Sequence, residues 1–196
     1  VSDVGAGNQS WKNKFGFQLG AKYFNAFNVR DLLVQVELNS VRPYVYSHSA
    51  VITNYGHNNQ SVGHQWGGNF QELIAIARYH KGRWLADAKL TVGKRGLDFD
   101  TAEDSYNYGG NIYKSYDVKR PYDTGVKIGQ GNKTNVFIAD IQGGYLINPM
   151  TNLKLFGSLI YRNFDPTQET AATFKQSTTW FSIGLRSDIF NWYFDY

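Results

Sequence analysis

The chain of 196 residues contains no cysteine and no long apolar run. Without cysteine it has no disulfide bonds and no thiolate metal sites, which is compatible with an oxidising compartment but does not prove one. No segment reaches the roughly 18 consecutive apolar residues that a membrane-spanning helix needs. Charged residues make up only 18% of the chain and there is a single methionine, so the composition disfavours a helical bundle.

A concentration of charge of one sign is also absent, as are catalytic motifs. The net charge of +4 is spread along the chain rather than gathered in a basic tract, so we do not expect nucleic-acid binding. We find no Gly-x-Ser-x-Gly elbow, no His-Glu-x-x-His motif and no evident catalytic carboxylate pair, and therefore do not expect an enzyme. A mean hydropathy of −0.44 does not separate a soluble protein from a membrane barrel, because half of each barrel strand faces water.

Aromatic residues and alternating side chains dominate what is present. The chain has 14 Tyr, 13 Phe, 5 Trp and 20 Gly. In the segment 84–92, apolar or small residues at even positions alternate with largely polar residues at odd positions. Because successive side chains of a strand point to opposite faces, this pattern predicts a strand with one apolar and one charged face.

The same alternation predicts seven strands. In the second of them, the apolar positions change phase after Ser40, which predicts either a bulge or an exit from the bilayer. Pro43 points the same way, because it cannot donate to a strand ladder. The predicted strands cover about 14–24, 32–47, 71–80, 83–95, 134–147, 152–163 and the segment from 178.

The connections between these strands alternate in length. Short connections (25–31, 81–82 and 148–151) alternate with two long ones (about 48–70 and 96–133), and the intermediate segment 164–177 precedes the last strand. The C-terminus alternates Trp192, Phe194 and Tyr196 and ends on an aromatic residue. Bacterial outer-membrane barrels share short periplasmic turns and longer extracellular loops.

We therefore predict an all-β fold, an antiparallel transmembrane β-barrel in the bacterial outer membrane, with residues 1–196 in a single domain. Single-chain bacterial barrels normally have an even number of strands, and an open sheet edge in hydrocarbon is costly. No secretory leader follows Val1. We expect the chain to be the C-terminal portion of a larger barrel, with earlier strands preceding Val1.

The polar faces of the predicted strands carry charges of both signs. In a barrel these side chains would face the lumen, where they pair across strands or meet water, and they indicate no strong ion selectivity. In a soluble sandwich the same side chains would form the solvent-exposed surface. The predicted lumen-facing charged residues are Lys22, Glu37, Asp87, Lys89, Asp140, Arg162 and Arg186, with Gln18, Lys154 and Asp188 on the same faces.

Scattered short motifs resemble one known family. They are FGFQLG at 15–20, RPYVYSH at 42–48, NYGHNNQ at 54–60, GHQWGGNF at 63–70, NYGGNI at 107–112 and GLRSDIFN at 184–191. Together they resemble the C-terminal part of Bacteroidetes outer-membrane proteins of the Wzi-like capsule-assembly family, to which gliding-motility-associated barrels also belong. The resemblance implies a large barrel, with about twice the strands seen here, that retains polysaccharide at the cell surface or serves surface machinery. It implies no catalytic residues.

The long loop at 48–70 gathers histidines, amides and aromatic rings. Sugar rings stack on aromatic faces and sugar hydroxyls bind planar amides, so the loop is a candidate saccharide site. The alternative is a folded loop that plugs the barrel and satisfies its own polar groups. A zinc site is less favoured, because no carboxylate lies near the histidines in sequence. The candidate ligand-binding residues are Tyr55, His57, Asn58, Gln60, His64 and Trp66.

The second long loop begins with an acidic segment and continues with basic and aromatic residues. Oxygen-rich segments suit Ca²⁺, although the EF-hand order of ligands is missing, and a solvated acidic loop is the alternative. The later residues, among them Lys114 and Tyr113, suit an acidic polysaccharide or a protein partner. The candidate calcium ligands are Asp98, Asp100, Glu103 and Asp104, and no other cofactor is expected.

Three functions remain open from the sequence. The first is an outer-membrane barrel with a structural or binding role at the cell surface, whose partners are the lipid bilayer and surface polysaccharide or other outer-membrane proteins. The second is a porin-like solute channel. The third is a soluble β-sandwich that binds carbohydrate.

Overall fold

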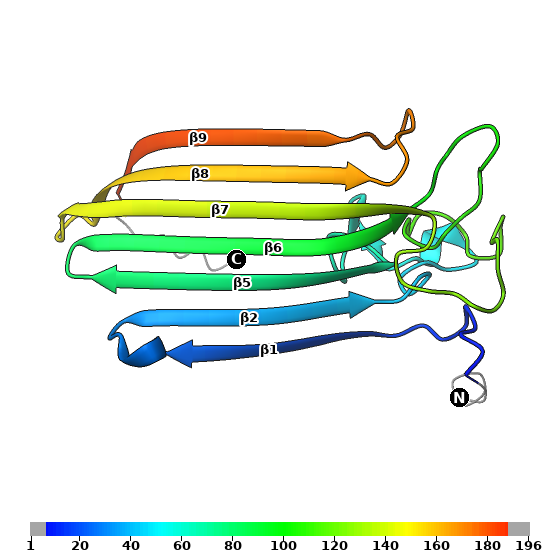
Figure 1. Ribbon diagram of the computed structural model, residues 1–196, viewed down its shortest axis with the longest axis horizontal. Helices are drawn as coiled ribbons and strands as arrows, with labels where there is room; N and C mark the ends of the chain where they lie inside the picture. Colours follow the sequence, from blue (N-terminus) through cyan, green and yellow to red (C-terminus); the bar gives the residue numbers. More distant parts are fainter. Residues whose placement is uncertain (1–6, 188–196) are drawn as a thin grey trace, which may run out of the picture.

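The fold is all-β. The computed structural model describes residues 7–187, and seven strands of that part form one antiparallel sheet in the order β1-β2-β5-β6-β7-β8-β9 (Figure 1). All seven predicted strands are present, but the second ends at Val41 and not near residue 47 as predicted. Their bounds are β1 (Gly16–Phe24), β2 (Leu32–Val41), β5 (Phe70–Lys81), β6 (Trp84–Leu97), β7 (Asn132–Asn148), β8 (Leu153–Pro166) and β9 (Gln176–Arg186).

Short elements occupy the connections. The hairpin of β3 (Gly56–His57) and β4 (Gln60–Ser61) was not predicted, and it lies in the connection between β2 and β5. Two single-turn 3₁₀ helices, η1 (Ala26–Asn28) and η2 (Val51–Thr53), complete the described elements. Within residues 7–187, no helix has the length and apolar character needed to cross a membrane.

The register of the sheet places the predicted apolar residues on one face. Leu38 lies opposite Leu73, Leu73 opposite Val92, and Val92 opposite Phe137, so apolar side chains from four strands share a row. Because neighbouring strands of an antiparallel sheet align residue by residue, each strand's alternation adds to one continuous apolar face.

The apolar face is not covered by a second layer of described residues. Phe17, Leu90, Ile141 and Ile183 come from four different strands and are 46%, 41%, 48% and 69% exposed. In a soluble sandwich these side chains would pack against a second sheet. Such packing is not observed in residues 7–187.

The sheet is open in the part of the chain that the structure describes. β1 and β9 each have one hydrogen-bonded neighbour and lie at opposite edges (Figure 1). The antiparallel all-β fold is therefore observed, whereas closure into the predicted barrel is not. The alternating aromatic residues of the C-terminus (Trp192, Phe194 and Tyr196) and Asp188 lie outside the described residues.

The predicted polar side chains do share the second face. Lys89 lies directly opposite Asp140, and Arg78, which the prediction missed, forms an ion pair with Asp87 at 3.6 Å. Farther along the sheet, the hydroxyl groups of Ser158 and Ser182 are 2.6 Å apart. The other predicted members that lie on this face are Lys22, Glu37, Arg162, Arg186, Gln18 and Lys154.

At one end of the sheet the second face becomes apolar, which explains the phase change in β2. The register of β2 is regular up to its last residue, Val41, so the predicted bulge is wrong and the strand simply ends. Val41 packs with Trp66, Phe70 and Val136 in a small core. Burial of these side chains holds the connection 42–69 over the second face.

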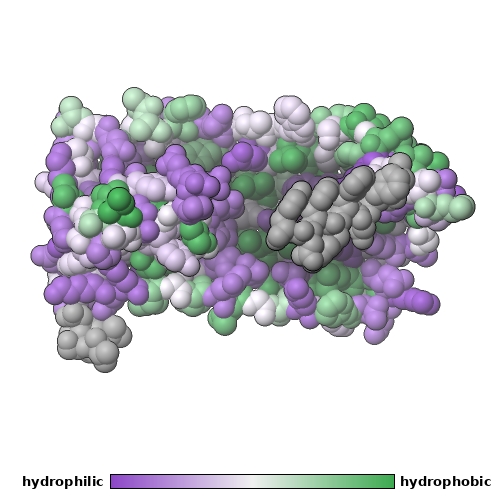
Figure 2. Space-filling view, turned by 180° about the vertical axis from the view of Figure 1, so that it is seen from behind, coloured by the Kyte–Doolittle hydropathy of each residue, from purple (hydrophilic) through white to green (hydrophobic). Residues whose placement is uncertain are grey.

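The long connections gather at this same end, which we call the loop end. The connections 42–69, 98–131 and 167–175 all leave the sheet there, whereas short turns join the strands at the opposite end (Figure 1). Viewed from behind, hydrophilic side chains predominate over the loop end (Figure 2). The structure thus separates a long strand region from a polar loop end.

Candidate functional site

A buried amide organises the loop end. Asn69, the residue before β5, is fully buried, and its Nδ2 lies 3.0 Å from the carbonyl oxygen of Gly96, 3.2 Å from that of Tyr108 and 3.0 Å from that of Gln130. Its Oδ1 accepts a hydrogen bond of 2.7 Å from the backbone N–H of Gly129. One side chain therefore ties the end of β6 to the connection 98–131.

Two further residues fix the loops to one another. The Arg42 guanidinium donates to the carbonyl oxygens of Asn13 at 2.8 Å and Val126 at 3.1 Å. The hydroxyl group of Tyr44 is buried and donates to the carbonyl oxygen of Asn107 at 2.8 Å. Burial raises the pKa of Tyr44 above its ordinary value, because the phenolate form would lose its solvation. These contacts give the loops a fixed arrangement.

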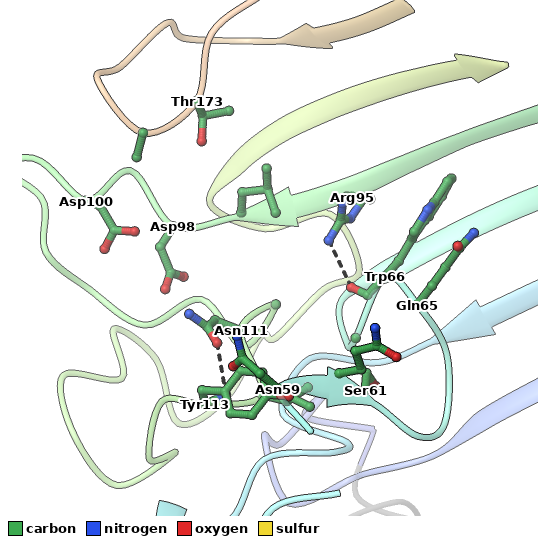
Figure 3. Close-up of a pocket in the computed structure, with 16 residues that line it drawn as sticks. Asn59, Ser61, Gln65, Trp66, Arg95, Asp98, Asp100, Asn111, Tyr113 and Thr173 are labelled. Carbon is green, nitrogen blue, oxygen red and sulfur yellow. Dashed lines mark hydrogen bonds between the residues drawn. The ribbon is translucent and has the colours of Figure 1, made fainter. Parts of the chain in front are cut away.

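Between the fixed loops lies a polar cleft of about 690 Å³ (Figure 3). Its walls come from the β3–β4 hairpin and the residues after it, from the end of β6, from the connection 98–131 and from the connection 167–175. The side chains that line it include Asn59, Gln60, Ser61, Gln65, Trp66, Arg95, Asp98, Asp100, Asn111, Tyr113 and Thr173.

One wall of the cleft is acidic, and a single lysine offsets part of its negative charge. The Lys114 ammonium lies 2.7 Å from Asp98 Oδ2 and 2.6 Å from Asp100 Oδ1. Asp98 Oδ1 also accepts a hydrogen bond of 2.7 Å from the backbone N–H of Tyr108. Burial disfavours the charged form of Lys114, but the hydrogen bonds to the two aspartates outweigh this and raise its pKa above its ordinary value.

This pairing argues against the predicted calcium site. A lysine ammonium occupies the space between Asp98 and Asp100, and Asp104 Oδ2 accepts a hydrogen bond of 2.8 Å from the Tyr108 hydroxyl group. Among the described residues, no group of three or more His, Asp or Glu side chains could hold a metal ion. The four carboxylates, including Glu103, are close in sequence but are not assembled into a coordination shell.

The opposite wall is formed by Arg95 and the segment at Trp66. Arg95 Nη2 donates to the carbonyl oxygen of Trp66 at 3.1 Å, and the guanidinium carbon lies 5.6 Å from the centre of the Trp66 ring (Figure 3). Trp66 is only 7% exposed, since Phe70 and His64 also pack against it. Its ring therefore serves mainly as part of the small core, although Trp66 also lines the cleft.

The predicted saccharide-binding residues separate into two groups. Tyr55 is exposed and stacks on Tyr46 with ring centres 5.7 Å apart, while His57 and Gln60 pair in the exposed β3–β4 hairpin. Asn58 forms the turn of that hairpin with a φ of 48°, a left-handed conformation that asparagine tolerates. Of this first group, Gln60 lines the cleft.

The second group, His64 and Trp66, packs against the sheet. His64 Nε2 lies 2.8 Å from Glu72 Oε1, and the histidine ring stacks on Phe70 with centres 4.3 Å apart. Glu72 is buried, and Asn39 Nδ2 donates to the same oxygen at 2.9 Å. The carboxylate that the sequence did not place near the histidines thus comes from β5. His64 and Trp66 both hold the connection 42–69 against the sheet.

Sequence reasoning missed the cation of the cleft. The sequence predicts Arg95 only as the last residue of a strand, and Asn111 only as part of a family motif. The signal that could have found Arg95 is its position beyond Val92, where the apolar alternation of β6 ends, on the face that carries Lys89. Comparison of the chain with protein-family models, curated proteins and solved structures gave no match.

Proposed function

We propose that this chain is part of the wall of an outer-membrane β-barrel whose loop end binds saccharide at the cell surface. The observation that carries the membrane assignment is the apolar face, which is uncovered and carries no charged side chain across the central part of all seven strands. Such a face has to meet either a second protein layer or lipid.

The dimensions of this face support lipid as its partner. On β6 the apolar positions run from Trp84 to Val92, which spans about 27 Å along the strand at the usual rise per residue. That length is close to the apolar band of about 25 Å on outer-membrane barrels. Tyr79, Trp84 and Tyr145 lie toward the short-turn end, as expected for the aromatic girdle at a membrane interface.

The polar second face and the loop end support the remainder of the proposal. In a barrel the charged side chains of the second face would line the lumen, and the long connections would lie outside the cell. The cleft at the loop end offers amide, hydroxyl and charged groups of the kind that bind sugars. The resemblance to the Wzi-like capsule-assembly family is in keeping with attachment of surface polysaccharide.

The membrane assignment can be tested with two neighbouring residues. The chain has no cysteine, so Leu90→Cys and Lys89→Cys each introduce one reactive thiol. The two side chains lie on opposite faces of β6. After spin labelling of the protein in lipid vesicles, we expect the label at 90 to collide with oxygen, which is concentrated in lipid, and the label at 89 to collide with a water-soluble nickel complex.

The alternatives to a membrane barrel predict different results for the labels at positions 89 and 90. If the label at 90 is shielded from both reagents, a second protein layer covers the face and the sandwich function replaces the membrane assignment. If both labels collide equally with the nickel complex, neither face meets lipid and the proposal is wrong. A porin-like channel is distinguished by single-channel conductance in planar bilayers.

A further inference from the structure

We infer that the cleft at the loop end takes a carboxylated saccharide, with the Arg95 guanidinium as the anchor for its carboxylate group. The inference deepens the proposed saccharide binding and rests on it. It names the chemical class of the ligand and the residue that selects it.

The first step is the position of Arg95. Its guanidinium group is partly buried and borders the cleft, where its one hydrogen bond to a described residue is the bond from Nη2 to the Trp66 carbonyl oxygen (Figure 3). Its Nε is buried without a hydrogen-bond partner. Within residues 7–187, no carboxylate forms an ion pair with it.

The second step is the nearest acid, Glu72, which interacts with Arg95 electrostatically from the neighbouring strand. Its Oε1 is occupied, because His64 lies 2.8 Å away and Asn39 donates to it at 2.9 Å. Its Oε2 has no hydrogen-bond partner among the described residues, which confirms that it does not contact Arg95 directly. Glu72 therefore lessens the positive potential at Arg95 without occupying the guanidinium donors.

The third step is the balance of charge across the cleft. On the far wall, Asp98 and Asp100 share the ammonium group of Lys114, which offsets one of their two negative charges and gives both carboxylates a direct counter-ion. The guanidinium group of Arg95 is then the charge left without a direct counter-ion in the lining. A partly buried arginine fork binds a carboxylate with two parallel hydrogen bonds.

The fourth step is the set of groups available for sugar hydroxyls. The side-chain amides of Asn59 and Gln65 form no hydrogen bond with described residues and lie along the cleft (Figure 3). Tyr113 also lines the cleft. Its backbone N–H donates a hydrogen bond of 2.9 Å to Asn111 Oδ1, which fixes the Asn111 side chain. The volume of about 690 Å³ is within the range of small-molecule sites and accommodates a short oligosaccharide.

The experiment compares a charged probe with a neutral one that differs from it only by the methyl groups on its carboxyl groups. Calorimetric titrations of the purified protein in detergent use trigalacturonate and its methyl ester, a neutral analogue of nearly the same shape. We expect the wild-type protein to bind the acid more tightly than the ester. Raising the NaCl concentration should weaken binding of the acid and leave binding of the ester unchanged.

Variants then identify the anchor. Arg95→Gln should weaken binding of trigalacturonate at least about tenfold, because the carboxylate loses a partly buried charged partner, and should leave the ester unaffected. Arg95→Lys keeps the charge but loses the fork, and should give an intermediate loss. The matched control is Arg78→Gln, which removes an arginine of the same face that is paired with Asp87, and should leave both probes unaffected.

The outcomes separate the inference from the function on which it rests. Equal affinity of the wild-type protein for acid and ester overturns the choice of a carboxylated ligand, as does an equal loss for both probes in Arg95→Gln. In either case saccharide binding itself stands. If neither probe binds the wild-type protein, saccharide binding fails as well. The salt dependence of the wild-type protein decides the question even if Arg95→Gln does not fold.

Discussion

At the scale of single residues, Asn69 joins several segments of the loop end through its side-chain amide. Its amide reaches three carbonyl oxygens and one backbone N–H in a fully buried position. A buried polar group that loses its partner costs about 1–3 kcal/mol. Asn69 also has a φ of 59°, which asparagine adopts more readily than most residues.

We therefore expect Asn69→Ala to loosen the connection 98–131 and to lower the free energy of unfolding by at least about 2 kcal/mol. Limited proteolysis should cut this connection faster in the variant than in the wild-type protein. Asn111→Ala, at a more exposed position of the same connection, is the control and should change the rate little. Equal cleavage rates for Asn69→Ala and the wild-type protein would contradict the organising role of Asn69.

At Gly93 the packing leaves no room for a side chain. A Cβ atom there would lie 2.6 Å from Trp66 Cζ3 and 2.7 Å from the carbonyl oxygen of Gln71. The Trp66 ring rests on this glycine, so Gly93→Ala should displace the ring and destabilise the small core by about 1–3 kcal/mol. Denaturant unfolding followed by tryptophan fluorescence measures the change. Gly143→Ala, where a Cβ meets nothing within 4 Å, is the control on the same sheet.

Lys14, just before β1, has a lowered pKa. Its ammonium lies 3.4 Å from the centre of the Tyr116 ring, and burial lowers its pKa to about 8, with Asp117 acting in the opposite direction. In the unfolded chain the pKa is near 10.5, so the unfolded state binds more protons between these values. The contribution of Lys14 to stability should therefore rise as the pH increases from 8 to 10.5.

The titration can be measured directly by NMR from the Cε chemical shift of Lys14, with the resonance assigned from Lys14→Met. We expect a midpoint near 8 for Lys14 in the folded protein, below the 10.5 of the unfolded chain, and the denatured protein supplies the reference measurement. A midpoint close to that of the denatured protein would mean that the fold does not shield the Lys14 ammonium from water.

At the scale of elements, the strands were predictable and the cleft was not. Alternation such as Lys89–Leu90 is a local property, because each side chain faces opposite to the next whatever the partner strand. The phase change at Val41 could also be recognised in the sequence. Its cause is the contact of Val41 with Trp66, which belongs to the connection 42–69. The meaning of that signal therefore required the structure.

The cleft brings together residues whose association depends on loop conformation. Arg95 and Asp98 end one strand, Asn59 turns a hairpin, and Thr173 comes from the last connection. The pairing of Lys114 with Asp98 spans 16 positions and has no periodic signature. The composition of the loops identified them as candidate binding sites. The choice between a calcium site and an internal ion pair depended on the distances from Lys114 to Asp98 and Asp100.

At the scale of the whole molecule, the connection 42–69 lies over the second face of the sheet. If that face lines a lumen, the small core around Trp66 keeps the connection in the path of solutes. We therefore expect low single-channel conductance for the wild-type protein. Trp66→Ala removes a buried ring at a cost of about 3–5 kcal/mol and should release the connection and raise the conductance.

Trp84→Ala is the control for this prediction, because Trp84 lies on the apolar face at the opposite end of the sheet. It should leave the conductance at the wild-type value. High conductance in the wild-type protein itself would show that the connection does not obstruct the passage, and would favour the porin-like function.

The two free edges of the sheet have a practical consequence for anyone who produces this chain. The outer backbone groups of β1 and β9 have no strand beside them within residues 7–187, and both edges border an apolar surface. Such edge strands can form backbone hydrogen bonds with an extended segment of another chain. During refolding from inclusion bodies, dilution and early addition of detergent should thus favour single chains over fibrous precipitate.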